Sequence, residues 1–238
     1  MARVPSPRKG DMLIRSDLPD WRNNACLNFM HDGNQTAYSE GYRRGAQRLV
    51  QHVIETQSDQ DFLVYPIIFL YRHHIELVLK RLIRRAPSLI GRPLTEDEEN
   101  DLKRHRLDLL WQNLEPKLRE VCQVAGWKSP NHEDFEGIGD YIRQLVKRDP
   151  ESYSFRYAHS KRGAPSLPKR LKHVNLRHFA EMMERLAICL DGIDYATSHL
   201  LELKAEWQDE VASALPAGGP VVKGRGKTTG AELPMSQT

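Results

Sequence analysis

The chain has 238 residues, of which 39% are hydrophobic and 28% charged, and its formal net charge is +3. These proportions are typical of a soluble protein that forms one core with flanking segments. A net charge this small does not by itself indicate a nucleic-acid partner, so the local distribution of charge has to be considered.

The cysteines and the apolar runs indicate the compartment. Cys26, Cys122 and Cys189 are odd in number, far apart and without a CxxC pair. They therefore indicate neither a disulfide framework nor a zinc site, and they fit a reducing compartment. The N-terminal MARVPSPRKG lacks the apolar segment of a signal peptide. The longest apolar run, Phe62–Tyr71, is half as long as a membrane helix. We expect a cytoplasmic protein without a membrane segment.

Three regions differ in composition. Residues 1–34 are rich in proline and charge without any period, and we expect an arm of which Trp21 to Met30 can dock onto the domain. Residues 35–213 contain the apolar periodicity of a helical domain. Residues 214–238 are rich in glycine and proline, and we expect a disordered tail.

The first two helices are predicted from apolar spacing. Residues 35–57 carry apolar side chains three and four apart, which predicts an amphipathic helix. Asp61–Arg85 opens with ten residues of which eight are apolar, and an apolar stripe continues along its second half. This central helix should be the most buried one, with Pro66 causing a kink or a late start.

The middle of the chain predicts two more helices. Thr95 to Glu98 has the pattern of a capping box and opens a third helix through Leu114, which Pro116 is expected to bend or break before Gly126. Ser129-Pro130 is expected to cap a fourth helix, which ends near Pro150. Residues 150–174 contain three prolines and no period, which predicts a long basic loop.

The last helix is predicted over Leu176–Leu200, with apolar residues alternating three and four apart. This repeat has two interpretations: a subunit interface that forms a homodimer, or a bundle helix seated along its own neighbours. In either case the chain is predicted to be an all-α bundle of about five helices with a long C-terminal helix.

A row of polar side chains lies on the central helix. Arg72, Glu76 and Lys80 are each four residues apart, so they share one face of a helix that is otherwise apolar. Burying such a row without partners costs several kcal/mol. The row therefore meets partners elsewhere in the chain or faces a site. The alternative is a common surface row of ion pairs.

The basic loop holds a second group of candidate residues. Arg156 offers a planar fork for phosphate, and His159 titrates near neutrality and suits proton transfer. Tyr157 is suited to stacking on bases, beside cations that would contact phosphates. These candidate RNA-binding residues are Tyr157, Lys161, Arg162, Lys169, Arg170 and Lys172.

Familiar catalytic and cofactor motifs are absent from the sequence. It contains no GxxxxGK[ST], GxGxxG before a helix, HExxH or GxSxG. His105 and Asp108 form a lone pair at helical spacing without further support. We therefore expect neither a cofactor nor a metal ion.

Short motifs in this helix order resemble the HEPN superfamily of all-α domains. They are Glu76-Leu77 with Lys80, His105 with Leu107, and Arg156-Tyr157 after the fourth helix. The resemblance covers roughly residues 36–205. It implies a domain of four or five helices. Many such domains are metal-independent endoribonucleases that act as dimers, some in phage defence or toxin–antitoxin systems, and others are non-catalytic scaffolds.

One departure from that family bears on catalysis. The ribonuclease signature is an Arg, four to six residues, then a His, and no Arg of this chain has a His at that spacing. Arg156 and His159 are separated by only two residues. Two hypotheses follow. In the first, Arg156 and His159 act on RNA while Arg72 and Glu76 orient them. In the second, the chain is a non-catalytic module that dimerises or binds a protein partner.

Overall fold

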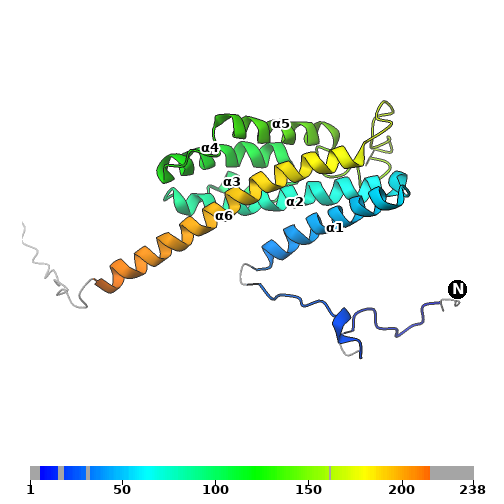
Figure 1. Ribbon diagram of the computed structural model, residues 1–238, viewed down its shortest axis with the longest axis horizontal. Coiled ribbons are helices and arrows are strands. Elements are labelled where there is room, and N and C mark those ends of the chain that lie inside the picture. The colour runs from blue at the N-terminus through cyan, green and yellow to red at the C-terminus, as the bar shows by residue number, and fades with distance from the viewer. Residues whose placement is uncertain (1–5, 16–18, 31–32, 161, 215–238) are drawn as a thin grey trace, which may run out of the picture.

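The computed structural model describes residues 6–15, 19–30, 33–160 and 162–214. Within these ranges the chain is helical and contains no strand beyond one isolated bridge in a loop. The α-helices are α1 Gln35–Thr56, α2 Gln60–Leu89, α3 Glu96–Asp101, α4 Leu107–Ala125, α5 His132–Arg148 and α6 Leu176–Ala214. The predicted all-α bundle with a long C-terminal helix is confirmed, with six described α-helices where about five were expected (Figure 1).

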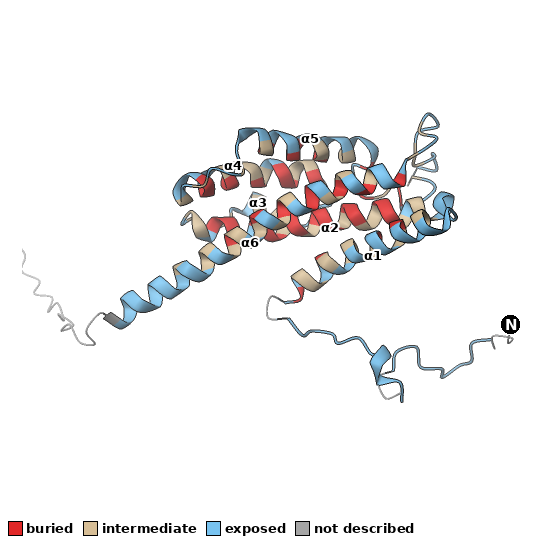
Figure 2. Cartoon of the chain, viewed as in Figure 1, coloured by how far each residue is buried: buried red, intermediate tan, exposed pale blue. Residues whose placement is uncertain are grey.

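α2 is the central element of the bundle. It packs against α1, α4 and α6, while α5 covers the outer side of α4 (Figure 1). Its buried positions recur on several faces, and its Ile75, Leu79 and Leu82 are fully inaccessible to solvent. Red buried residues concentrate along α2 and on the inward sides of α4 and α6 in Figure 2. The prediction that the central helix is the most buried is therefore confirmed.

One described helix is long and apolar enough to cross a membrane, judged by length and composition alone. This helix is α2, and half of its most apolar window is buried inside the bundle. The core helix of a soluble protein passes the same test. The expected absence of a membrane segment therefore stays a prediction.

The predicted course of the third helix was wrong at one boundary. The helix that begins after Thr95 does not continue to Leu114, because the chain leaves helical geometry between α3 and α4 and starts again at Leu107. Pro116 lies inside α4 without ending it. The missing N–H costs a hydrogen bond, but the helix is kept by the burial of Leu114 and Leu118 on its inner face.

The cap of the fourth predicted helix was also misplaced. Asn131, and not Ser129, is the N-cap of α5. Its side chain accepts from the Asp134 N–H at 3.0 Å, and the Asp134 carboxylate accepts from the Asn131 N–H at 2.8 Å. This capping box satisfies two backbone donors reciprocally, which Ser129 cannot do from two residues earlier.

The repeat on α6 serves the bundle along most of its length. Leu186, Leu190 and Ile193 are at most 4% exposed and belong to the core, where α6 packs mainly against α2. The bundle-helix interpretation of Leu176–Leu200 is therefore confirmed for most of the predicted stripe. Beyond Lys204, α6 continues as an exposed helix that projects past the bundle (Figure 2).

The described part of the N-terminal arm does not dock. Trp21, Leu27 and Phe29 are 70%, 81% and 62% exposed. The arm meets α1 through Asn34, whose side chain donates to the Asn28 side chain and accepts from the Met30 N–H. The expectation that Trp21 to Met30 would pack on the domain was wrong. The tail that was predicted over 214–238 lies, apart from its first residue, outside the described residues.

Candidate functional site

Glu76 is the centre of a polar cluster beneath the basic loop. Its side chain is 1% exposed, and its carboxylate accepts from Lys80 Nζ at 2.8 Å, from His105 Nδ1 at 2.8 Å and from Arg72 Nη1 at 3.3 Å. Burial by itself would raise the pKa of Glu76, but the hydrogen bonds from Lys80 and His105 and the positive charge of Lys80 outweigh it and lower that pKa. The carboxylate is therefore charged and fully partnered at neutral pH.

Arg72 joins three segments of the chain through backbone oxygens. Its guanidinium is fully buried and donates from Nη2 to the His105 carbonyl at 2.7 Å and from Nε to the Asp149 carbonyl at 3.2 Å. The Asp149 carboxylate lies 3.4 Å from the same Nε. Burial lowers the pKa of Arg72 and the two carboxylates oppose it. Arg72 thereby fixes the turn before α4 and the start of the basic loop around α2.

Asp149 carries this anchoring into the loop. Its Oδ1 accepts from the N–H groups of Tyr153 and Ser154 at 2.6 and 2.8 Å, which closes the first turn of the loop. Phe155 is then buried, and Arg156 donates from Nε to the Ser152 carbonyl. The beginning of the basic loop is therefore held by Asp149, which also pairs with the buried Arg72 of α2.

His105 has one ring nitrogen bound and an exposed ring. Its Nδ1 is held by Glu76, while its side chain is 55% exposed and its Nε2 has no hydrogen-bond partner among the described residues. A carboxylate on Nδ1 fixes the tautomer and the orientation of an imidazole and leaves Nε2 as a proton acceptor. This is the arrangement of an oriented general base.

A strip of rings runs along α2 from His73. His73 stacks on Phe69, with ring centroids 5.6 Å apart, and meets the edge of Tyr42 at 4.4 Å. The guanidinium of Arg156 lies 5.4 Å from the Phe69 centroid and 5.6 Å from the Tyr157 centroid. Burial lowers the pKa of His73, so its imidazole is neutral at neutral pH.

The structure brings most, but not all, of the predicted site residues together. Arg72 and Glu76 are bonded to each other, and Arg156 lies close enough to Arg72 for its positive charge to lower the pKa of Arg72 further. Arg156 itself is exposed and makes no bond to Glu76. The basic loop thus folds back toward the polar row of α2, as expected. The contacts are made by Asp149 with Arg72 and by Arg156 with the Phe69 ring.

His159 takes part in a different local structure. It forms an isolated bridge with Pro165, and the Ser160 N–H donates to the Ala164 carbonyl at 2.7 Å. The His159 side chain has no hydrogen bond, ion pair or ring contact with Arg72, Glu76 or Arg156 in the described residues. Its predicted role as the proton-transfer group stays a prediction that this geometry does not favour.

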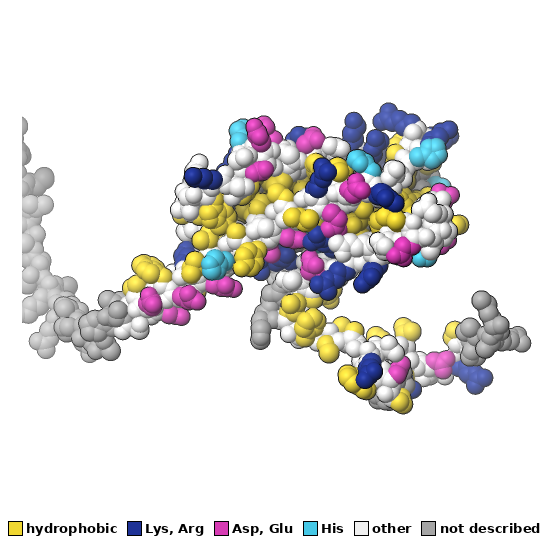
Figure 3. Space-filling model, in the orientation of Figure 1, with side chains coloured by type: hydrophobic (Ala, Val, Ile, Leu, Met, Phe, Trp, Pro, Cys, Tyr) yellow, Lys and Arg dark blue, Asp and Glu magenta, His cyan; other side chains and the backbone are white. Residues whose placement is uncertain are grey.

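The predicted phosphate-binding cations lie on the exposed loop. Arg162, Lys169, Arg170 and Lys172 are exposed, and Lys161 lies outside the described residues. Lys and Arg side chains gather at the end of the bundle where this loop lies (Figure 3). Such a cluster attracts a polyanion irrespective of its sequence.

Sequence reasoning missed the role of His105 and the ring contacts of His73. His105 was set aside as a lone pair with Asp108, although Asp108 in fact binds Arg106. The one available signal for His105 was that it belongs, with Leu107, to the same set of HEPN-like motifs as Glu76-Leu77. His73 differs, because its spacing of four from Phe69 places the two rings on one helical face.

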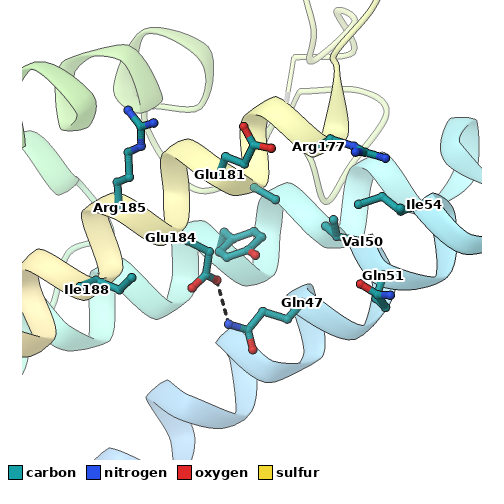
Figure 4. A pocket seen from close by; sticks show the side chains of 11 residues that line it. Gln47, Val50, Gln51, Ile54, Arg177, Glu181, Glu184, Arg185 and Ile188 are labelled. Carbon is teal, nitrogen blue, oxygen red and sulfur yellow. Dashed lines mark hydrogen bonds between the residues drawn. The ribbon is translucent and has the colours of Figure 1, made fainter.

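Away from this polar cluster, a depression lies between α1, α2 and α6 (Figure 4). It encloses about 550 Å³, and Figure 4 shows the Glu184 side chain directed toward Gln47, which donates to it at 3.0 Å. Arg43 donates to the same carboxylate at 2.6 Å. Because the central acid is satisfied by neighbouring side chains, we assign this depression to helix packing. No group of His, Cys, Asp or Glu suited to a metal ion occurs in the described residues.

The comparisons with known proteins gave no match. A scan against protein-family models matched none, and searches of curated proteins and of solved structures returned nothing significant. The HEPN resemblance therefore stays a prediction that rests on the short motifs quoted above.

Proposed function

We propose that the protein binds single-stranded RNA at the basic loop and cleaves it by phosphoryl transfer to the adjacent 2′-hydroxyl. The observation that carries this proposal is the bond between the buried Glu76 carboxylate and the exposed His105 ring, beside an exposed loop rich in cations. The supporting resemblance is the HEPN-like motif set.

The side chains have complementary roles in this reaction. His105 Nε2 accepts the proton of the 2′-hydroxyl as that oxygen attacks phosphorus, and Glu76 stabilises the imidazolium that forms. Arg156 donates to the non-bridging phosphate oxygens through its planar fork. The bond from phosphorus to the 5′-oxygen breaks, and that oxygen takes a proton from solvent. The products are a 2′,3′-cyclic phosphate and a 5′-hydroxyl.

The test is cleavage of a labelled single-stranded RNA by the purified full chain in EDTA. The wild type should yield 2′,3′-cyclic phosphate ends, and an RNA with one 2′-deoxy residue should stay intact at that position. His105→Ala should lower the rate by about 10²-fold or more, since a positioned acid or base contributes about that factor. His159→Ala distinguishes the two histidines and should change the rate little.

His132→Ala is the matched control, because His132 is an exposed histidine on α5 whose side chain is 72% exposed. It should cleave like the wild type. Intact RNA with correctly folded wild-type protein would remove the enzymatic proposal, and full activity in His105→Ala would remove His105 as its base. A loss confined to His159→Ala would transfer the proton-transfer role to the loop.

A second candidate function is self-association through the projecting end of α6. Leu203, Trp207 and Val211 are four residues apart and are 46%, 63% and 40% exposed. They form one apolar stripe on the end of α6, which projects past the other described helices (Figure 3). Two such stripes bury one another in a short coiled coil. This function requires no catalysis and is compatible with the first.

Light scattering at several concentrations tests this candidate. The wild type should be a dimer, and the double variant Leu203→Glu with Trp207→Glu should be a monomer. Ala205→Glu is the control, since it adds a charge to the opposite face of the same helix. A monomeric wild type would contradict self-association, and a monomeric Ala205→Glu would place the contact on another face.

A further inference from the structure

A pocket on the loop side of Arg156 is lined by aromatic side chains. It encloses about 390 Å³ between α2 and the loop, and Tyr65, Phe155, Arg156, Tyr157, Ser166 and Leu167 contribute to its wall. Tyr65 and Tyr157 are 46% and 50% exposed, while Phe155 is 6% exposed. Its volume is in the usual range for small-molecule sites.

The Tyr157 ring and the backbone of Tyr65 are held in place before any ligand arrives. Tyr157 is stacked on Tyr153, with ring centroids 4.4 Å apart, and its backbone N–H donates to the Tyr153 carbonyl. Tyr65 belongs to α2, one helical turn before Phe69. A flat apolar ligand can therefore contact the Tyr157 ring without first ordering it, which lowers the entropic cost of binding.

Ser166, which lines the pocket, has a side-chain hydroxyl that lacks a hydrogen-bond partner among the described residues. The hydroxyl oxygen of Ser166 is buried and makes no hydrogen bond, whereas the Ser166 backbone N–H donates to the Ala158 carbonyl at 3.0 Å. An unpartnered buried hydroxyl is unfavourable. Rotation about its single side-chain bond would direct it to the polar edge of a ligand in the pocket.

The pocket and the proposed cleavage site share Arg156. Its guanidinium lies between the Phe69 ring, which stacks on His73, and the Tyr157 ring, which borders the pocket. Tyr65, Phe69 and His73 are successive at four-residue intervals on α2, so the strip from pocket to His73 spans about 12 Å along the helix axis. A phosphate at Arg156 would thus have ring surfaces on one side and imidazoles on the other.

We infer that this pocket is a nucleobase subsite, which holds one base of a single-stranded RNA while Arg156 holds an adjoining phosphate. The inference rests on the proposed RNA-directed function and adds to it the group that the pocket recognises. Stacking on tyrosine tolerates every base, and the Ser166 hydroxyl adds a preference through the polar edge of the base. The cations further along the loop contact the backbone without discriminating among bases.

Binding by fluorescence anisotropy tests the inference with three labelled eight-residue probes at one salt concentration. They are 2′-O-methyl oligouridine, 2′-O-methyl oligoadenosine and an abasic 2′-O-methyl chain with the same phosphates. Methylation removes the attacking hydroxyl, so the probes stay intact. The full-length wild type should bind the base-containing probes about tenfold or more tightly than the abasic one.

The variants locate the effect in the pocket. Tyr65→Leu with Tyr157→Leu should reduce that ratio to within about twofold. The corresponding Tyr→Phe pair should retain the ratio, which shows that a loss is due to the rings and not to misfolding. Ser166→Ala should change the ratio between the uridine and adenosine probes. Tyr195→Leu, on a tyrosine of α6 that is 76% exposed, is the control.

The outcomes separate the two proposals. Equal wild-type affinity for the abasic and base-containing probes would overturn the subsite and leave phosphate binding standing. An unchanged ratio in the Tyr→Leu pair, or an equal loss in Tyr195→Leu, would also overturn it. If none of the three probes binds, the RNA-directed function fails and the subsite fails with it.

Discussion

At the scale of single residues, the buried charges of α2 are structural partners before they are anything else. Arg72 and Glu76 have side chains that are 0% and 1% exposed, and every bond that the structure gives them is to another part of the protein. Their contribution to chemistry is therefore indirect. Glu76 orients His105, and Arg72 positions the backbone on which His105 and the basic loop are built.

Replacing Arg72 should destabilise the fold strongly. Arg72→Leu removes one member of a buried ionic cluster and leaves Asp149 and part of Glu76 without a cation, which costs about 3–5 kcal/mol. Urea unfolding followed by circular dichroism measures the change. Arg84→Leu is the control on the same helix, because Arg84 is exposed and donates only a 3.4 Å bond to the Lys80 carbonyl. Equal urea midpoints for wild type and Arg72→Leu would contradict this account.

The residue scale also shows what spacing can and cannot predict. The four-residue interval of Arg72, Glu76 and Lys80 placed them on one face, and the cost of burying them predicted partners elsewhere. The partners were not predictable, because Arg72 uses the carbonyl oxygens of His105 and Asp149. Every residue has a carbonyl oxygen, so nothing in the identity of these two residues signals the contact.

At the scale of helices, α3 is a short element that a partly buried ion pair holds against α4. Lys117 on α4 is 2% exposed, and its Nζ lies 2.5 Å from Glu98 Oε1. The same Glu98 completes the capping box with Thr95. Burial would raise the pKa of Glu98, but Lys117 and the Thr95 N–H outweigh it and lower that pKa to about 2.

Glu98→Gln should therefore destabilise the protein at neutral pH and remove part of its acid sensitivity. A carboxylate whose pKa is lowered by folding stabilises the folded state above its unfolded pKa, and that contribution is lost as the pH falls toward the folded value. Wild-type stability should fall between about pH 4.5 and pH 2 partly through Glu98. Urea midpoints for both proteins across this range measure it. Parallel pH profiles would contradict the assignment.

The helix boundaries that failed have a common physical cause. The stop between α3 and α4 places His105 beside Glu76, and it is stabilised by contacts to α2 that local propensity does not contain. Pro116 is tolerated because burial of the inner face of α4 outweighs one lost hydrogen bond. Both outcomes depend on tertiary packing. The long α1, α2 and α6 patterns predicted their helices well because each contains many periodic positions.

At the scale of the whole molecule, the bundle and its two projections have different roles. The core includes residues of every helix from α1 to α6 except α3, whereas the described arm and the end of α6 expose large apolar side chains. α6 is 39 residues long, about 58 Å at 1.5 Å per residue, and its core residues all lie in its first half, between Leu176 and Ile193. The projections are therefore available for intermolecular contacts and are not needed to complete the fold.

Ending the chain after Ala205 tests this division of roles. The truncation keeps Lys204, whose Nζ donates to the Ser88 carbonyl at 2.6 Å, and removes Trp207 and Val211. Loss of exposed residues changes the free energy of unfolding by no more than about 0.5 kcal/mol, so Tm should move by no more than about 2 °C at a concentration where both proteins are monomeric. Thermal unfolding by circular dichroism gives the Tm, and light scattering of the same samples gives the oligomeric state. A fall of many degrees in the monomer would show that the end of α6 supports the bundle, and undiminished dimerisation would place the interface elsewhere.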